Sequence, residues 1–155
     1  MKGIKLQLGD YVFIKSLSGG YHTTLIKVAA IHQKKVGYHN VPNKLNWVRF
    51  SLLEPIPLTS EILEKNGFIA RQGHLNPNNS YHWEFSQYEE ETGALLYDIK
   101  AYCCNPFRGL YISIENHADC EPINFSKQIE HFHEFQQALR LCGLDELADN
   151  LKMEE

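Results

Sequence analysis

The sequence lacks any long apolar run. No stretch of its 155 residues approaches the roughly 18 apolar residues that a membrane-spanning helix needs. Its first residues also lack the apolar segment and the small-residue cleavage site of a signal peptide. We therefore expect a cytoplasmic protein with no membrane partner, whose four cysteines stay reduced.

Motifs of the common catalytic families are missing as well. The sequence contains no phosphate-binding P-loop, no dinucleotide fingerprint and no nucleophile elbow. It therefore predicts no cofactor, no metal and no catalytic residue, and it favours a protein that is not an enzyme.

Acidic residues are nearly absent from the first third of the chain. Residues 1–50 contain eight Lys or Arg and one acid, Asp10, which gives a formal charge of +7. Residues 51–155 contain seven Lys or Arg and eighteen Asp or Glu, which gives −11. This asymmetry suggests that the two regions face different partners, or face one another. The alternative is that both sets of charges are simply solvated.

The composition itself is globular, with 43% hydrophobic and 22% charged residues. Within residues 1–56, short runs of β-branched and aromatic residues alternate with turn-forming residues. Four short strands are predicted, at about residues 11–14, 25–31, 35–39 and 45–50. The segment Leu6-x-Leu8-Gly9-Asp10-Tyr11-Val12 resembles the opening strand of SH3-like small barrels, in which Gly-Asp makes the turn. The resemblance implies a basic, SH3-like small barrel or sheet over residues 1–56.

Two prolines in Glu54-Pro55-Ile56-Pro57-Leu58 mark the predicted boundary with a second, acidic part, residues 57–155. Thr59 is placed to cap a short helix over residues 60–66, and Gly67 is placed to end it. The alternating strands and turns that follow predict an antiparallel meander.

A long helix is predicted near the end of the chain, at about residues 126–141. Its apolar residues recur at spacings of three and four, which predicts one stripe that covers a face of the meander. The stripe consists of Ile129, Phe132, Phe135, Leu139 and Cys142. The predicted fold class is therefore α+β.

Residues 54–68, EPIPLTSEILEKNGF, are similar to the "PIPLTEEILLKNGF" stretch of small uncharacterised proteins encoded by gut bacteria and their prophages. Those proteins also begin with an "lGnyV"-like strand and end with a helix of the "YVHQLQNLYFALTG" type, to which residues 131–143 are similar. The intervening strands do not match. The resemblance implies an origin in a phage or another mobile element, and it implies no activity and no functional residues.

Basic and aromatic residues are interleaved along residues 1–56. The set comprises Lys15, Lys27, Lys34, Lys35, Lys44 and Arg49 with Tyr11, Phe13, Tyr21, Tyr38, His39 and Trp47. Lysines that neutralise phosphates beside aromatic faces that stack on bases are what sequence-tolerant nucleic-acid binding needs. The alternative is that the aromatics form the core and the lysines only solubilise the protein. As contact residues of a module that binds nucleic acid or an acidic protein we choose Lys34, Lys35, Tyr38, Lys44 and Trp47.

Two other functions stay open. One is a protein–protein adaptor or homo-oligomer, in which the acidic part binds a basic partner or the first part of another copy. The other is a small enzyme or metal protein that uses His117, Asp119 and Cys120, which supply the residue types of a thiol nucleophile, its base and an orienting acid.

A metal site on the predicted C-terminal helix has weaker support. Glu130 and His133 form one Glu-x-x-His unit, whereas di-iron bundles need that unit on two helices. His131 and His133 lie about 200° apart around a helix and cannot reach one ion together. We therefore expect these histidines to lie on a solvated polar face.

Overall fold

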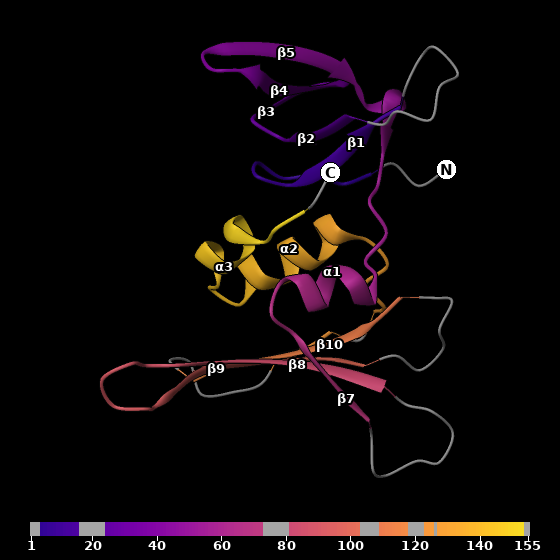
Figure 1. The fold of residues 1–155 in the computed structure, drawn as a ribbon. Helices are drawn as coiled ribbons and strands as arrows, with labels where there is room; N and C mark the ends of the chain where they lie inside the picture. The colour runs from indigo at the N-terminus through magenta and orange to yellow at the C-terminus, as the bar shows by residue number, and fades with distance from the viewer. Residues whose placement is uncertain are drawn as a thin grey trace.

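The computed structural model describes residues 4–15, 24–72, 81–102, 109–117, 123–125 and 127–153. Within them the protein is a mixed α+β fold with antiparallel sheets, as the sequence predicts. Figure 1 shows three layers: the N-terminal strands, a layer of helices, and a larger sheet on the other side of the helices.

The N-terminal strands form two three-stranded antiparallel sheets, β2-β1-β6 and β3-β4-β5. Their bounds are β1 Tyr11–Ile14, β2 Thr24–Lys27, β3 Ala30–His32, β4 Lys35–Val41, β5 Lys44–Arg49 and β6 Leu53–Glu54, with a 3-10 turn at Phe50–Leu52 between β5 and β6. The described strands do not close into a barrel, so the SH3-like barrel stays a prediction.

The predicted turn before the first strand is present. Gly9 has a φ of +85°, which glycine adopts without strain. Its N–H donates a hydrogen bond to the carbonyl of Val28, the residue that follows β2, at 2.8 Å. Successive side chains of β1 point to opposite faces of its sheet, and both faces are packed. Val12 lies in the core between the two small sheets, whereas Tyr11 and Phe13 pack toward the helices.

The short helix α1, Ser60–Lys65, confirms the predicted cap, because the Thr59 hydroxyl accepts a hydrogen bond from the Ile62 N–H at 3.4 Å. Gly67 follows it with a φ of +84°, as expected for a residue that ends a helix in the left-handed region. The chain then enters the larger sheet.

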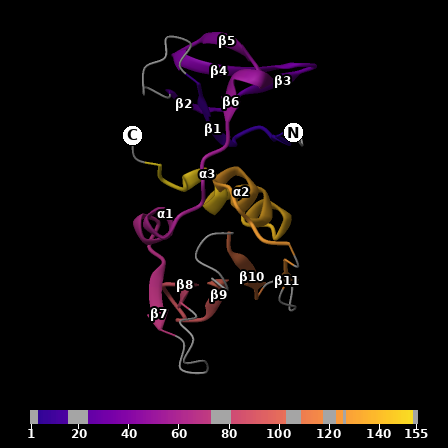
Figure 2. The ribbon, with the colours of Figure 1, turned by 90° about the vertical axis from the view of Figure 1, so that its right-hand side faces the viewer.

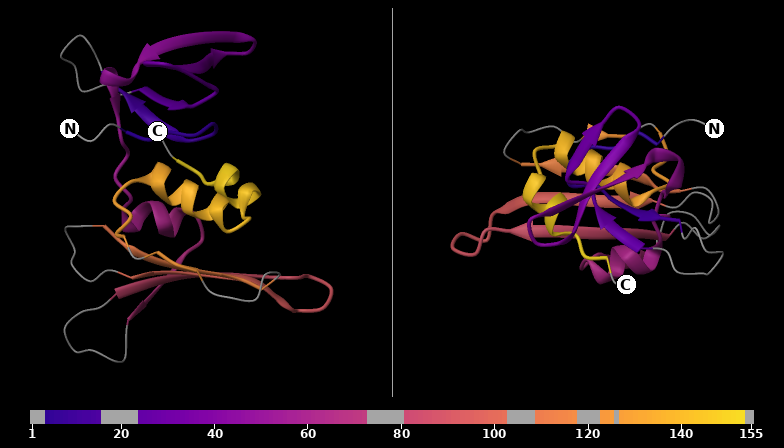
Figure 3. Two further views of the ribbon diagram at one scale, coloured as in Figure 1. Left: turned by 180° about the vertical axis from the view of Figure 1, so that it is seen from behind. Right: turned by 90° about the horizontal axis from the view of Figure 1, so that it is seen from above.

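That sheet is the predicted antiparallel meander, with its strands side by side in chain order. The strands are β7 Ile69–Gln72, β8 Tyr81–Tyr88, β9 Leu95–Tyr102, β10 Tyr111–Asn116 and β11 Ile123–Asn124. The views from the side and from behind place the helices on one face of the sheet (Figures 2 and 3). The view from behind also shows the β8–β9 hairpin extending past them (Figure 3).

The long helix α2, Phe132–Leu141, begins later than predicted. The backbone just before it bonds to other segments instead of forming a helical turn. Ile129 exchanges both backbone hydrogen bonds with Leu110, and the Phe132 N–H donates to the Ile56 carbonyl at 2.8 Å. These tertiary bonds take the donors and acceptors that a helix starting near residue 126 would use.

The predicted apolar stripe is buried, with all five members at most 6% exposed. The helix packs on two sides, however, and not only on the meander. Phe135 contacts Phe68 at a ring distance of 5.9 Å, and Phe132 contacts Tyr11 of β1 at 6.2 Å. A second short helix, α3 (Asp145–Asn150), completes the helical layer.

Candidate nucleic-acid interface

The outer face of the β3-β4-β5 sheet is defined by strand register. Lys35 of β4 lies opposite His32 of β3 and opposite Arg49 of β5. Directly opposed residues in antiparallel strands point to the same face, so these three bases form one row across the sheet. The neighbouring residue Val36 points the other way and is fully buried, which fixes this face as the outer one.

Lys35 and Arg49 are therefore like charges placed side by side. Opposed like charges on a sheet are destabilising. Among the described residues neither forms an ion pair with a carboxylate, and the chain contains no Asp or Glu between Asp10 and Glu54. The pair leaves a concentrated positive charge that an external anion can neutralise.

Two more lysines lie at the same end of the small sheets. The Lys15 N–H donates to the Leu52 carbonyl at 2.8 Å, just after β5 ends. The Lys34 carbonyl accepts from the Phe50 N–H at 3.1 Å. These bonds bring the end of β1 and the β3–β4 turn to the end of β5. We call Lys15, Lys34, Lys35 and Arg49 the basic end.

An open hollow of about 680 Å³ lies at the basic end. Its lining combines cations with aromatic and aliphatic side chains: Ile14, Lys15, Lys35, Tyr38, Trp47, Val48, Arg49, Ser51 and Leu52. Such a lining can pair with an anionic group and at the same time cover a flat apolar one.

Trp47 is the exposed aromatic residue of this face, with 46% of its surface accessible. The centres of the Trp47 and His32 rings lie 6.3 Å apart, and the ring planes meet at 76°. Directly opposite Trp47 on β4 is Gly37, which has no side chain and is buried beneath the side chains of Ala30 and Leu45. A Cβ at Gly37 would lie 3.0 Å from the Ala30 Cβ and 3.1 Å from Leu45, so a side chain there is disfavoured.

The structure brings three of the predicted contact residues to the basic end or its hollow in the same way. Lys35 and Trp47 share the outer face and line the hollow, and Lys34 lies in the adjoining turn. Tyr38 also lines the hollow, but it alternates with Lys35 and packs against the core of the small sheets. Lys44 lies at the other end of β5, roughly 17 Å away for a strand of this length.

Sequence reasoning did not select Lys15, Arg49 or His32 as contact residues. Because residues two apart on a strand point to the same face, the spacing of Trp47 and Arg49 could have placed both on one face. Lys15 and His32 come from other strands, and only the sheet register places them there.

Other members of the interleaved set lie on the side of the N-terminal sheets that faces the helices. Tyr11 and Phe13 pack against the larger core, as the alternative interpretation expected of the aromatics. Lys27 Nζ lies 5.5 Å from the centre of the Tyr11 ring and 4.0 Å from Oδ1 of Asp149 in α3. Tyr21 lies outside the described residues.

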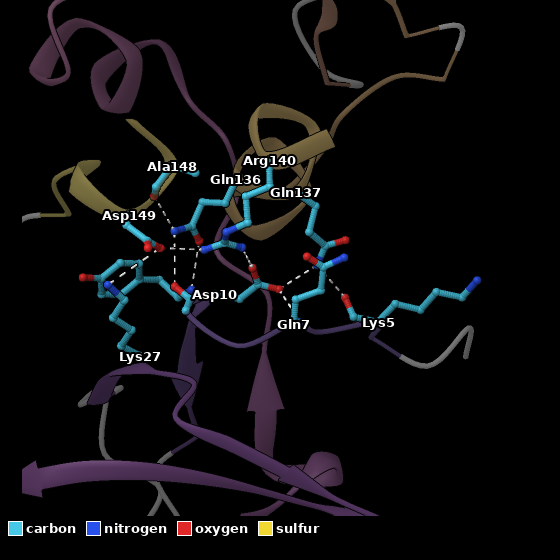
Figure 4. A network of polar contacts seen from close by, with 11 residues as sticks. Lys5, Gln7, Asp10, Lys27, Gln136, Gln137, Arg140, Ala148 and Asp149 are labelled. Atoms are coloured by element: carbon cyan, nitrogen blue, oxygen red, sulfur yellow. Dashed lines mark hydrogen bonds and ion pairs between the residues drawn. The ribbon is translucent and has the colours of Figure 1, made fainter. Parts of the chain in front are cut away.

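The junction between the two parts pairs an acid of the basic first part, Asp10, with a base of the acidic second part, Arg140 (Figure 4). Asp10, the one acid of residues 1–50, is fully buried and accepts hydrogen bonds from the Gln7 N–H at 2.8 Å, Gln137 Nε2 at 2.6 Å and Arg140 Nη1 at 2.7 Å. Arg140 Nη2 also donates to Asp149 at 3.0 Å. Burial alone would lower the pKa of Arg140, but its bonds to Asp10 and Asp149 raise it, so the guanidinium stays charged.

A neutral side chain completes this junction. Gln136 of α2 is fully buried, accepts from the Tyr11 N–H at 3.0 Å and donates to the Ala148 carbonyl at 3.0 Å. The network thus joins β1, α2 and α3, and none of its hydrogen bonds or ion pairs involves a side chain of the basic end. Lys27 is the one described base of the first part that pairs with a carboxylate of the second.

The predicted alternative site is divided. His117 follows β10, and its Nε2 lies 3.6 Å from Glu115 Oε1. Asp119 and Cys120 lie outside the described residues. Within the part of the chain that the structure describes, no three His, Cys, Asp or Glu side chains gather in a way that could hold a metal ion.

The expectation that His133 is solvated is wrong. His133 is a buried residue of α2, with 4% of its surface exposed, and its Nδ1 has no hydrogen-bond partner among the described residues. His131 is the N-cap residue of α2 and has extended backbone, which lets the two rings stack at 5.6 Å. Burial, the largest cause, lowers the pKa of His133, while the charges of Asp10 and Glu134 oppose that shift.

This burial makes stability depend on pH. Because the pKa of His133 is lower in the folded than in the unfolded chain, unfolded molecules take up the proton first as the pH falls below about 6.5. We expect the free energy of unfolding to fall between about pH 7 and pH 5, and His133→Leu to flatten that fall. Denaturant titrations across this range measure it. Identical pH profiles for the two proteins would contradict the assignment of this pH dependence to His133. At pH 8 the variant should be at least as stable as the wild type, since it removes an unpartnered polar atom.

Comparisons with protein-family models, with curated proteins and with solved structures find no match, so the function must be inferred from this chain's own residues. Among the described residues, no helix has the length and apolar character needed to cross a membrane.

Proposed function

We propose that the protein is a binding module that holds nucleic acid at the basic end and on the outer face of the β3-β4-β5 sheet. The observation that carries this proposal is the cross-strand pair Lys35–Arg49, two cations without a described counter-ion, next to the exposed indole of Trp47. Phosphates supply the missing negative charge, and bases supply flat surfaces for the aromatic ring.

The exposed aromatic favours nucleic acid over an acidic protein. Carboxylates of a protein partner could neutralise Lys35 and Arg49, but they would leave the surface of Trp47 without a matching flat group. Residues 51–155, with their formal charge of −11, repel a polyanion. Contact should therefore be confined to the N-terminal sheets.

A salt titration tests the proposal. We expect a mixture of single- and double-stranded oligonucleotides to bind at about 50 mM salt, and binding to weaken as salt rises. With four cations at the basic end, the slope of log K against log salt should be about −3 to −4. Fluorescence anisotropy of labelled oligonucleotides measures it.

Two results would redirect the proposal. Absence of binding at about 50 mM salt would end the nucleic-acid version. Binding of polyglutamate in its place would favour an acidic protein partner, and salt-sensitive self-association in light scattering would favour a homo-oligomer held by opposite charges.

A further inference from the structure

We infer that the nucleic acid is single-stranded and that one of its bases stacks on Trp47; this inference rests on the proposed function and narrows its ligand. Trp47 presents nearly half of its surface to solvent on an open sheet face. Every base has a π-face, so an exposed indole can hold any of them without reading the sequence.

The surroundings of Trp47 favour a flat guest. His32 supports the indole by an edge contact, and Leu45, which is 39% exposed, lies on the same face two residues before it. Opposite Trp47, the bare backbone of Gly37 lets the Ala30 and Leu45 side chains lie close to the sheet. The result is a shallow apolar shelf bordered by the row of His32, Lys35 and Arg49.

The spacing of the shelf and the cations suits one strand of nucleic acid. Trp47 and Arg49 are two residues apart on one strand, a distance of roughly 6.6 Å, and Lys35 is one strand away, roughly 4.8 Å from Arg49. These distances are comparable with those between the base and the phosphate of a nucleotide. A base on Trp47 therefore leaves its phosphate, or that of its neighbour, beside the cation pair.

A duplex cannot use this arrangement. Its bases are paired and stacked inside the helix, and only an element that enters a groove reaches their edges. Trp47 lies within β5 on a sheet face and not in a protruding loop that could enter a groove. A duplex could contact the basic end through its phosphates alone, so it should bind more weakly than a single strand.

Three labelled probes of about 12 nucleotides separate these contributions, a length within the range of small stacking modules. They are oligothymidine, the same length of abasic strand, and a duplex. Fluorescence anisotropy at about 50 mM salt should show the wild type binding oligothymidine more tightly than the other two. Trp47→Leu should weaken oligothymidine binding by about 5- to 100-fold and leave abasic binding unchanged.

Tyr88→Leu is the matched control, because Tyr88 is an aromatic of similar exposure, 53%, on the meander and far from the basic end in sequence. It should leave all three affinities unchanged. Equal wild-type affinity for oligothymidine and the abasic strand would overturn the stacking inference while leaving the proposed function intact, and this comparison needs no variant to fold. Failure of all three probes to bind would instead remove the proposed function itself.

Discussion

Replacing Arg140 with methionine is expected to destabilise the protein by about 3–5 kcal/mol. The substitution leaves the Asp10 carboxylate fully buried and without its cationic partner, which lies 2.7 Å away in the native protein. It also removes the bond to Asp149 that joins α2 to α3. Chemical denaturation followed by circular dichroism measures the loss.

Arg71→Met is the matched control. Arg71 pairs with Glu84 at 3.2 Å, but its side chain is 57% exposed, so loss of that pair should cost no more than about 1 kcal/mol. The double variant Asp10→Asn with Arg140→Met leaves no lone buried charge and should regain part of the stability. Equal losses for Arg140→Met and Arg71→Met would show that the Asp10–Arg140 pair does not hold the two parts together.

Reversing the charges of Lys35 and Arg49 to glutamate should weaken oligonucleotide binding by about 100- to 1,000-fold. The two reversals change the charge near the phosphates by four units, each worth about 1 kcal/mol in a water-exposed site. Both residues are exposed, so the fold should survive. Anisotropy titration with oligothymidine measures the effect.

The control for this variant reverses Lys44 and Lys152, which changes the net charge by the same amount away from the hollow. It should weaken binding far less. Equal effects of the two reversals would mean that overall charge, and not the basic end, determines binding. The neutral pair Lys35→Gln and Arg49→Gln should also fold at least as stably as the wild type, because it relieves the repulsion of opposed cations.

Local features of the fold could be predicted from the sequence because neighbouring residues determine them. The Thr59 cap, the turn at Gly9 and the left-handed Gly67 each depend on side chains within a few positions. The apolar stripe of the C-terminal helix was also correct, since helical periodicity requires it to be buried. The start of α2 was wrong because Ile129 and the backbone around it bond to segments distant in the chain.

The candidate site was only partly predictable. In the sequence Lys35, Lys44 and Arg49 are equivalent bases, and only pairing in the sheet opposes Lys35 to Arg49 and sends Lys44 to the far end. A shift in register between His39 and Val41 alters that pairing and has no sequence signature here.

The junction was not foreseen either. Asp10 was visible as the one acid of a basic region, but its partner Arg140 lies 130 residues away. The likeness to phage-encoded proteins and the division at residue 56 stay predictions.

The most direct measurement is the salt dependence of oligothymidine binding in the wild type and in the Lys35→Gln, Arg49→Gln variant. Each cation that neutralises a phosphate of a single strand contributes about −0.7 to the slope of log K against log salt. If the opposed pair contacts the backbone, the slope should become shallower by about 1.4 in the variant. An unchanged slope would show that the phosphates bind elsewhere on the molecule and would contradict the assignment of the basic end.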